Sequence, residues 1–194
     1  MAIDSGAYFP IWGTCMGEYR YMLKLELNRE YNLITVTITN LFSGLEILTY
    51  LSNEESDPLT RCNSNDQGAN LIFTENYPKS RFGMSSPKDV DDILSQQNVT
   101  INFHNWCLTP ENFTKQEPLK NFWNVLSTNY DENGLQFISM MESKHYPIWA
   151  VQYHPEKNMF EWTEKYSNIP HTRDAVHIAA FESQFFIEVN NLLL

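Results

Sequence analysis

Two apolar runs along the chain each stop at a short cluster of small or polar residues. The first run covers residues 7–12 (AYFPIW) and stops at residues 13–17 (GTCMG), and the second covers residues 146–153 (YPIWAVQY) and stops at residues 154–156 (HPE). Continuous apolar runs of this length, bounded by turn residues, are typical of strands buried on both faces of a sheet. We therefore expect two buried strands that end at chemically active residues.

The rest of the chain alternates between helical and strand periods. Apolar residues three or four apart, or strong helix formers, predict helices over residues 18–32, 45–51, 87–96, 121–127 and 173–194. Alternating or β-branched residues predict strands over residues 33–39, 71–73, 99–103 and 135–140. The polar stretch over residues 52–67 is typical of a surface loop. Because strands and helices interleave, the predicted fold class is α/β, in one domain over residues 1–194.

The composition and net charge of the chain argue against several classes of protein and partner. The 194 residues include 13 Lys and Arg against 24 Asp and Glu, which gives a net charge of −11, and 14% are aromatic. The aromatic content excludes a disordered acidic tail. Scattered basic residues on a negative chain argue against a nucleic-acid partner. No run approaches the roughly 20 apolar residues of a membrane-spanning helix, and the first residues lack the features of a secretory signal.

The three cysteines are Cys15, Cys62 and Cys107. They are too few and too far apart in sequence for a disulfide framework or a paired-cysteine zinc site, and the odd number leaves at least one free thiol. We therefore expect no metal and no cofactor. Asn98 and Asn112 each begin an N-glycosylation sequon, which has a role only in a protein that enters the secretory pathway.

Cys15 is the central residue of a Gly-x-Cys-x-Gly turn directly after a predicted strand. Such a turn projects the side chain of its central residue from the end of the strand, while the backbone N–H of the next residue, Met16, can bind a developing oxyanion. This pattern is typical of a nucleophile. The alternative is a buried structural cysteine beside a glycine turn, since free cysteine is among the most buried residue types.

His154 and Glu156 follow the second buried strand, with a proline between them. In a Cys–His–Glu relay the imidazole takes the thiol proton, and the carboxylate fixes the orientation of the ring and favours its charged form. The alternative is a surface histidine beside a solvated glutamate. Both motifs at strand ends of one α/β sheet favour the relay.

The motifs taken together resemble the gamma-glutamyl hydrolase family. They are FPIWGTCMG, NFHNW, YPIWAVQYHPEK, FEW and DAVHIAAFESQFF, in this order along the chain. The resemblance implies a class I glutamine amidotransferase-like fold, which is a flavodoxin-like three-layer α/β/α sheet. It also implies a cysteine peptidase that removes γ-linked glutamates from folate poly-γ-glutamates, in the lysosome or vacuole or after secretion. A homodimer is a further expectation.

The resemblance assigns roles to individual residues. It implies that Cys15 is the nucleophile, His154 the general base and Glu156 the third member of the relay. His104, in NFHNW, matches a histidine that lies near the substrate in the family, although a polar residue satisfied by backbone at a strand end is an equal alternative. Asn112 matches a glycosylation position of the family.

The chain departs from the family pattern in two places. Residues 18–44 separate the nucleophile motif from the LEIL sequence that continues the family pattern, so we interpret them as an insertion. Only 14 residues precede Cys15, whereas a doubly wound sheet places several β-α units before its central strand, so we expect N-terminal strands to be missing. The alternative to a hydrolase is therefore a catalytically inactive fragment or a non-catalytic binding module of the same fold.

We predict that residues 18–44 come from a retained intron or a gene-model error. Both edges of the block can be encoded as splice sites, and splicing there would remove 27 codons in frame. Most transcripts of the gene should therefore lack these codons, which sequencing of full-length transcripts would show. Reads that cover the whole block in most transcripts would contradict the prediction.

Overall fold

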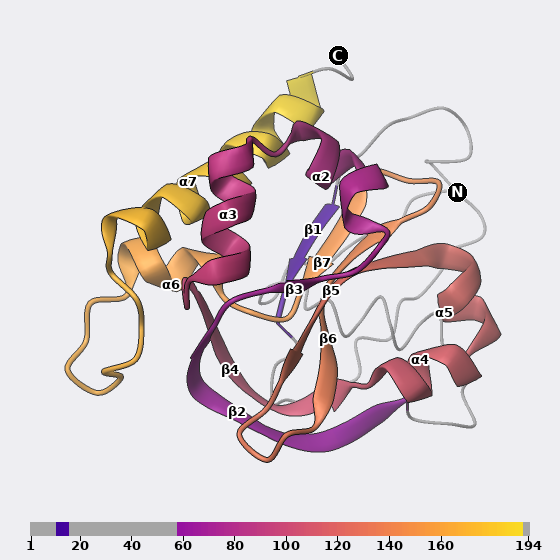
Figure 1. The fold of residues 1–194 in the computed structure, drawn as a ribbon, viewed down its shortest axis with the longest axis horizontal. Helices are drawn as coiled ribbons and strands as arrows, with labels where there is room; N and C mark the ends of the chain where they lie inside the picture. The colour runs from indigo at the N-terminus through magenta and orange to yellow at the C-terminus, as the bar shows by residue number, and fades with distance from the viewer. Residues whose placement is uncertain (1–10, 16–57, 192–194) are drawn as a thin grey trace, which may run out of the picture.

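The computed structural model describes residues 11–15 and 58–191 (Figure 1). The helices and the strand expected within residues 18–51, the insertion over residues 18–44 and the oxyanion donor Met16 lie outside the described residues. The domain boundaries and the expected upstream strands therefore stay predictions.

A five-stranded mixed sheet lies at the centre of the fold, in the order β1-β7-β6-β5-β3. At one end of the described strands, β1 (Ile11–Thr14) pairs in parallel with β7 (Ile148–Val151). The next strands, β6 (Gln136–Ser143), β5 (Trp123–Tyr130) and β3 (Ile72–Phe73), join as antiparallel neighbours. A separate antiparallel pair consists of β2 (Leu59–Ala69) and β4 (Thr100–Leu108).

Helices cover both faces of the larger sheet. One apolar cluster joins alternate residues of β7, Trp149 and Val151, to α2 (Arg81–Ser85), α3 (Lys88–Gln96) and α7 (Arg173–Asn191). The intervening residues of β7, Ile148 and Ala150, join a second cluster with α4 (Pro110–Lys115) and α5 (Glu117–Phe122). Since successive side chains of a strand point to opposite faces, these clusters lie on the two sides of the sheet. The α/β class and its three layers are confirmed.

Within residues 11–15 and 58–191, most expected elements occur, with two exceptions. Residues 121–127 were predicted to be helical, but β5 begins at Trp123, directly after the short helix α5. Residues 52–67 were predicted to be a loop, but β2 begins at Leu59. Both errors have a tertiary cause: Trp123 is buried in the core beside α5, and the polar strand β2 satisfies its backbone by pairing with β4.

The remaining helices are short. They are the 3₁₀ turn η2 (Tyr77–Lys79) and α6 (Pro155–Phe160), which follows β7. Within the described residues, no helix combines the length and the apolar character that crossing a membrane requires.

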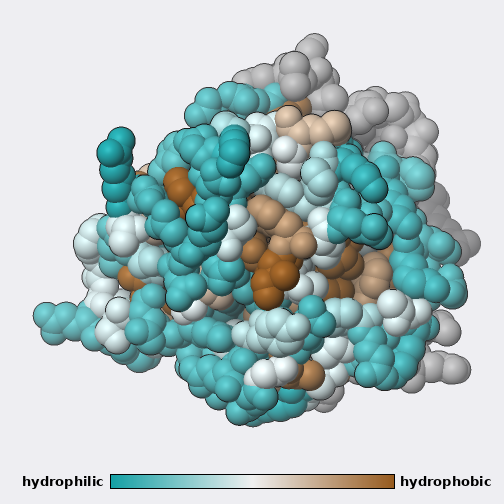
Figure 2. Space-filling view, in the orientation of Figure 1, coloured by the Kyte–Doolittle hydropathy of each residue, from teal (hydrophilic) through white to brown (hydrophobic). Residues whose placement is uncertain are grey.

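The surface in Figure 2 is mostly hydrophilic, with a hydrophobic area in the middle of the face, where Figure 1 shows β3 and β5. Ile72 of β3 is 42% exposed. β3 is the edge strand on this side and has only two residues. So short an edge offers few unpaired backbone groups to another chain.

The buried carboxylate of Glu142, on β6, connects the central sheet to α2. Its two oxygens accept hydrogen bonds from the backbone N–H groups of Arg81 and Phe82, from Arg81 Nε at 3.0 Å, and from Trp149 Nε1 at 2.8 Å. Arg81 also donates to the carbonyl oxygens of Ser143 and Tyr146. A buried charge with this many partners stabilises the fold only while all of them are present.

We predict that Glu142→Ala lowers the free energy of unfolding by about 3–5 kcal/mol, because the substitution leaves Arg81 and three N–H donors without their acceptor. Urea unfolding followed by circular dichroism measures the change. Asp92→Ala is the control, since it removes only the exposed pair with Lys88, and it should change stability far less. Equal effects of the two substitutions would contradict this role for Glu142.

Candidate active site

Cys15 lies directly after β1 and has an unusual backbone conformation. Its φ angle is +57°, in the left-handed region that residues other than glycine seldom adopt. Its N–H donates to the carbonyl oxygen of Val151 at 2.8 Å, which continues the pairing of β1 with β7 by one residue. A conformation of this kind costs on the order of 1–3 kcal/mol and occurs often at functional sites. Cys15 therefore has a strained backbone conformation at the centre of the Gly-x-Cys-x-Gly motif.

His154 reaches the same place from the neighbouring strand. It caps the N-terminus of α6, with Pro155 as the first helical residue, and its N–H donates to the carbonyl oxygen of Ile101 at 2.8 Å. His154 Nδ1 lies 2.7 Å from Glu156 Oε1. Cys15 lies close enough to the imidazole to raise its pKa, and the thiol of Cys15 and the ring of His154 both lie beside Phe103. The structure thus brings together Cys15, His154 and Glu156, in the order that a nucleophile, a base and an orienting carboxylate require.

Charge and burial act in opposite directions on this group. Burial lowers the pKa of His154, but the hydrogen bonds and charges of Cys15 and Glu156 outweigh burial and raise the pKa from 6.5 to about 9. Burial likewise disfavours the Glu156 carboxylate, yet the hydrogen bond and charge of His154 lower its pKa overall. At neutral pH the imidazole is therefore protonated beside an ionised carboxylate.

Phe103 is a residue of this site that the sequence analysis missed. Its ring meets the His154 ring edge to face, with centroids 6.1 Å apart, and its carbonyl oxygen lies 3.9 Å from Cys15 Sγ. Lys157 Nζ lies 4.7 Å from the centre of the same ring. The NFHNW motif directed attention to the neighbouring histidine. The alternation of side chains along a strand could have revealed Phe103, because adjacent residues of β4 point to opposite faces and only one of the two can face His154.

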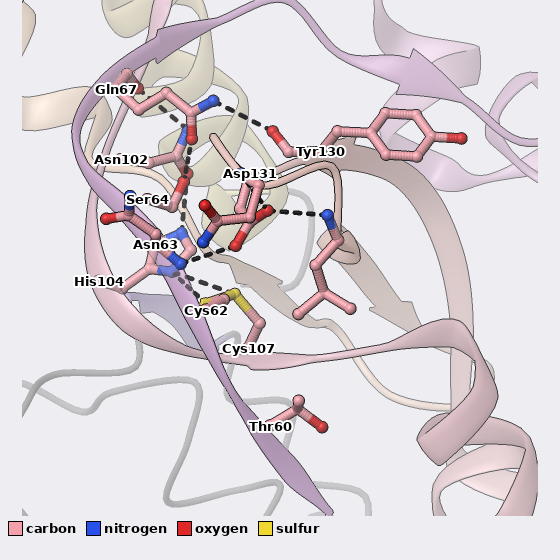
Figure 3. The surroundings of a disulfide bond; sticks show 12 residues. Thr60, Cys62, Asn63, Ser64, Gln67, Asn102, His104, Cys107, Tyr130 and Asp131 are labelled. Carbon is pink, nitrogen blue, oxygen red and sulfur yellow. Dashed lines mark hydrogen bonds between the residues drawn. A yellow bond between two sulfur atoms is a disulfide. The ribbon is translucent and has the colours of Figure 1, made fainter.

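His104, the residue after Phe103 in β4, lies in a buried cluster beside Cys62 and Cys107 (Figure 3). It is 2% exposed, and its Nε2 lies 3.2 Å from Asn102 Oδ1. Its Nδ1 lies 3.5 Å from the sulfur of Cys62 and 3.4 Å from that of Cys107. Burial, followed by the charge of His154, lowers the pKa of His104 to about 3. Its role beside the substrate stays a prediction.

Cys62 and Cys107 form a disulfide, with Cα atoms 6.0 Å apart. The sequence analysis was wrong to regard these cysteines as too far apart, because the antiparallel pairing of β2 with β4 brings together residues 45 apart in sequence. The expectation of at least one free thiol is confirmed, since Cys15 is free.

The two sequons differ in their surroundings. Asn98 is exposed, in the turn before β4. The side-chain nitrogen of Asn112 donates to the carbonyl oxygen of Pro58 at 3.0 Å and to Thr60 Oγ1 at 2.9 Å. Glycosylation of either residue stays a prediction, and at Asn112 a glycan would replace one of the two N–H hydrogens that make these hydrogen bonds.

Comparison with known proteins supports the resemblance drawn from the motifs. The chain is 37% identical over 186 residues to a gamma-glutamyl hydrolase of Rattus norvegicus, an alignment that covers 96% of this chain and 49% of the relative. This chain is a homologue of gamma-glutamyl hydrolases. The human gamma-glutamyl hydrolase is 36% identical over the same share of each chain.

More distant gamma-glutamyl hydrolases align over the same extent. Gamma-glutamyl hydrolase B of Dictyostelium discoideum is 31% identical over 94% of this chain and 45% of the relative. The chain therefore spans about half the length of the curated gamma-glutamyl hydrolases it matches. No family model matches the chain.

We predict that Glu156→Gln lowers the pKa of His154, because the substitution removes a negative charge 2.7 Å from the imidazole. NMR titration of the imidazole C–H signals measures this pKa. In the native chain the folded pKa of about 9 exceeds the ordinary 6.5. The stabilisation from imidazolium is therefore complete below about pH 6.5 and is lost as the pH rises through 9. In the variant, this stabilisation should be lost from a lower pH. An unchanged pKa of His154 would contradict the role of Glu156 in stabilising the imidazolium.

Proposed function

We propose that this chain carries the active site of a cysteine hydrolase that cleaves the γ-glutamyl bonds of folate poly-γ-glutamates. The observation that carries the proposal is the convergence of Cys15, His154 and Glu156 at the ends of two adjacent parallel strands. The similarity to gamma-glutamyl hydrolases supports the bond and the substrate class.

The reaction follows from the roles of these three residues. The Cys15 thiolate attacks the carbonyl carbon of the γ-amide, and a covalent tetrahedral adduct forms. The imidazolium of His154 donates its proton to the leaving amine as the C–N bond breaks, which leaves a thioester on Cys15. Neutral His154 then takes a proton from water, which attacks the thioester and releases the γ-carboxylate. The backbone N–H of Met16 is the proposed donor to the oxyanion.

Glu156 and Phe103 position the imidazole in this scheme. The carboxylate holds Nδ1, so that Nε2 is directed towards the thiol and the leaving amine. The ring of Phe103 packs against the edge of the imidazole. Together, these contacts favour one orientation of the imidazole. Holding reacting groups in a fixed orientation accounts for much of the rate advantage of intramolecular reactions.

The compartment belongs to the same proposal. We propose that the protein acts in the lysosome or vacuole, or after secretion. The disulfide between Cys62 and Cys107 supports this placement, because such bonds persist in oxidising compartments and are rare in the cytosol. Glycosylation at Asn98 or Asn112 and assembly as a homodimer are part of the same proposal.

We predict that Cys15→Ala lowers the rate of glutamate release from a γ-linked glutamate peptide by at least about 10⁴-fold, since no other thiol can form the thioester. Glu156→Gln should lower the rate by about 10²–10⁴-fold, because the base loses its orienting charge. The double variant Cys15→Ala/His154→Ala should be no slower than Cys15→Ala alone, because the two residues act as one unit. Chromatographic detection of free glutamate measures all three rates.

The assay uses the protein translated from the sequenced full-length transcript beside the 194-residue chain. Met84→Ala is the control, since Met84 is 68% exposed on α2, which packs on one face of the sheet, and it should leave the rate unchanged. Turnover retained in Cys15→Ala would exclude Cys15 as the nucleophile. Absence of turnover in both native proteins would favour a non-catalytic binding module of the same fold.

A further inference from the structure

We propose that Cys62, Cys107 and His104 form a zinc-binding site when their disulfide is reduced. The three donor atoms lie within 4.8 Å of one another, and all three residues are buried. The inference does not depend on the proposed hydrolysis, since none of these residues takes part in the bond-breaking steps. Figure 3 shows His104 directed at both sulfur atoms, between β2 and β4.

The position of the imidazole already fits a tetrahedral metal. Zinc lies about 2.3 Å from thiolate sulfur and about 2.0–2.1 Å from imidazole nitrogen, so a tetrahedral site separates the sulfur and nitrogen atoms by about 3.5 Å. His104 Nδ1 lies 3.5 Å from Cys62 Sγ and 3.4 Å from Cys107 Sγ. Only the two sulfur atoms have to separate, to about 3.8 Å.

The hydrogen bonds around His104 direct the lone pair of Nδ1 at the sulfurs. Asn102 Nδ2 donates to the carbonyl oxygen of Gln67, which orients Asn102 Oδ1 towards the imidazole. Because a carbonyl oxygen only accepts, Nε2 of His104 donates in this contact, and Nδ1 is the ring nitrogen that faces the two sulfurs. Metal-binding histidines are held in this way, with the distal N–H donating to an oxygen acceptor.

The β2–β4 pair is irregular beside the three donors. The pairing register shifts between Arg61 and Ser64, so that two residues of β2 face one residue of β4. His104 and Cys107 are both buried although they are three apart, a spacing that places side chains on opposite faces of a regular strand. A disulfide requires only the two cysteines, so the covalent bond does not by itself place the His104 ring beside the two sulfur atoms.

The turn between β5 and β6 holds the irregular part of β2 in place. Asp131 Oδ2 accepts from the N–H of Asn63 at 2.7 Å, and Glu132 N–H donates to the carbonyl oxygen of Asn63 at 3.0 Å. Gly134, with φ of +82°, closes this turn. Since Asn63 follows Cys62 directly, we expect these hydrogen bonds to keep Cys62 beside His104 after the disulfide is broken.

The balance of the exchange is simple. A dithiol reductant supplies two electrons and two protons, converts the disulfide into two thiols, and becomes a cyclic disulfide itself. Zinc then displaces one proton from each thiol and binds two thiolates and the neutral imidazole. Both oxygens of Asp131 already accept hydrogen bonds, so a water molecule takes the fourth position. Disulfide and metal are mutually exclusive.

Cobalt(II) is the probe for this site, because thiolate ligands give it a near-ultraviolet charge-transfer band and tetrahedral geometry gives intense visible bands. The host is Cys15→Ala, so that Cys62 and Cys107 supply all the thiols. After reduction by a dithiol, removal of the reductant and anaerobic titration, we expect one cobalt ion per chain. Zinc should displace the cobalt and protect both cysteines from alkylation. The oxidised chain should give neither band.

Matched variants separate this site from general thiol binding. Cys62→Ser and Cys107→Ser should each lose the charge-transfer band of the two-thiolate site, and Asn102→Ala should weaken zinc binding by about 10–100-fold. Circular dichroism follows the fold throughout, and if reduction unfolds the chain, zinc should restore the native spectrum. The proposal is wrong if the folded, reduced chain shows no cobalt bands, if both serine variants match the host, or if zinc fails to refold an unfolded chain.

Discussion

The parallel pairing of β1 with β7 is the constraint on which the candidate site depends. Its register places Thr14 beside Val151, and the N–H of Cys15 donates to the carbonyl oxygen of Val151. Because parallel strands end on the same side of a sheet, the residues that follow them must meet there. A shift of one residue in this pairing would move Cys15 away from His154. Both strands are held by the two apolar clusters: β7 contributes buried residues to each cluster, and Trp12 and Ile11 of β1 pack against one cluster each.

Strand β4 is the second support of the site, and its two faces differ in chemistry. The carbonyl oxygen of Ile101 in β4 accepts from His154 N–H, and that of Val99, the residue just before β4, accepts from Asn158 Nδ2. These hydrogen bonds attach both the base and α6 to the start of this strand. Phe103 contacts the His154 ring, whereas His104, the next residue, faces the disulfide. The disulfide of Cys62 and Cys107 therefore joins β2 to the same strand, β4, that holds His154 by a hydrogen bond.

The success of the sequence analysis varied with how local the governing interactions are. The helix expected over residues 87–96 occurs as α3, because its start is encoded in adjacent residues, a proline followed by acids in the first turn. β5 was predicted as a helix because its local propensity gives no sign of Trp123 being buried beside α5. β2 was predicted as a loop because its residues are polar, and only pairing with β4 makes an extended conformation favourable.

By itself, the sequence determined the α/β class, the two strands β1 and β7, and the residues that follow them, Cys15, His154 and Glu156. Of the two strands, which were both expected to be buried, β7 is buried throughout, whereas three of the four residues of β1 are only half-buried. Continuous apolar runs and a Gly-x-Cys-x-Gly turn are local signals, so they need no partner to be recognised. The tertiary structure alone decided that Cys62 and Cys107 pair, and that His104 faces their sulfurs rather than Phe103's side of β4. These outcomes depend on the register of β2 against β4 and on one irregularity within it, and no run of adjacent residues specifies such a register.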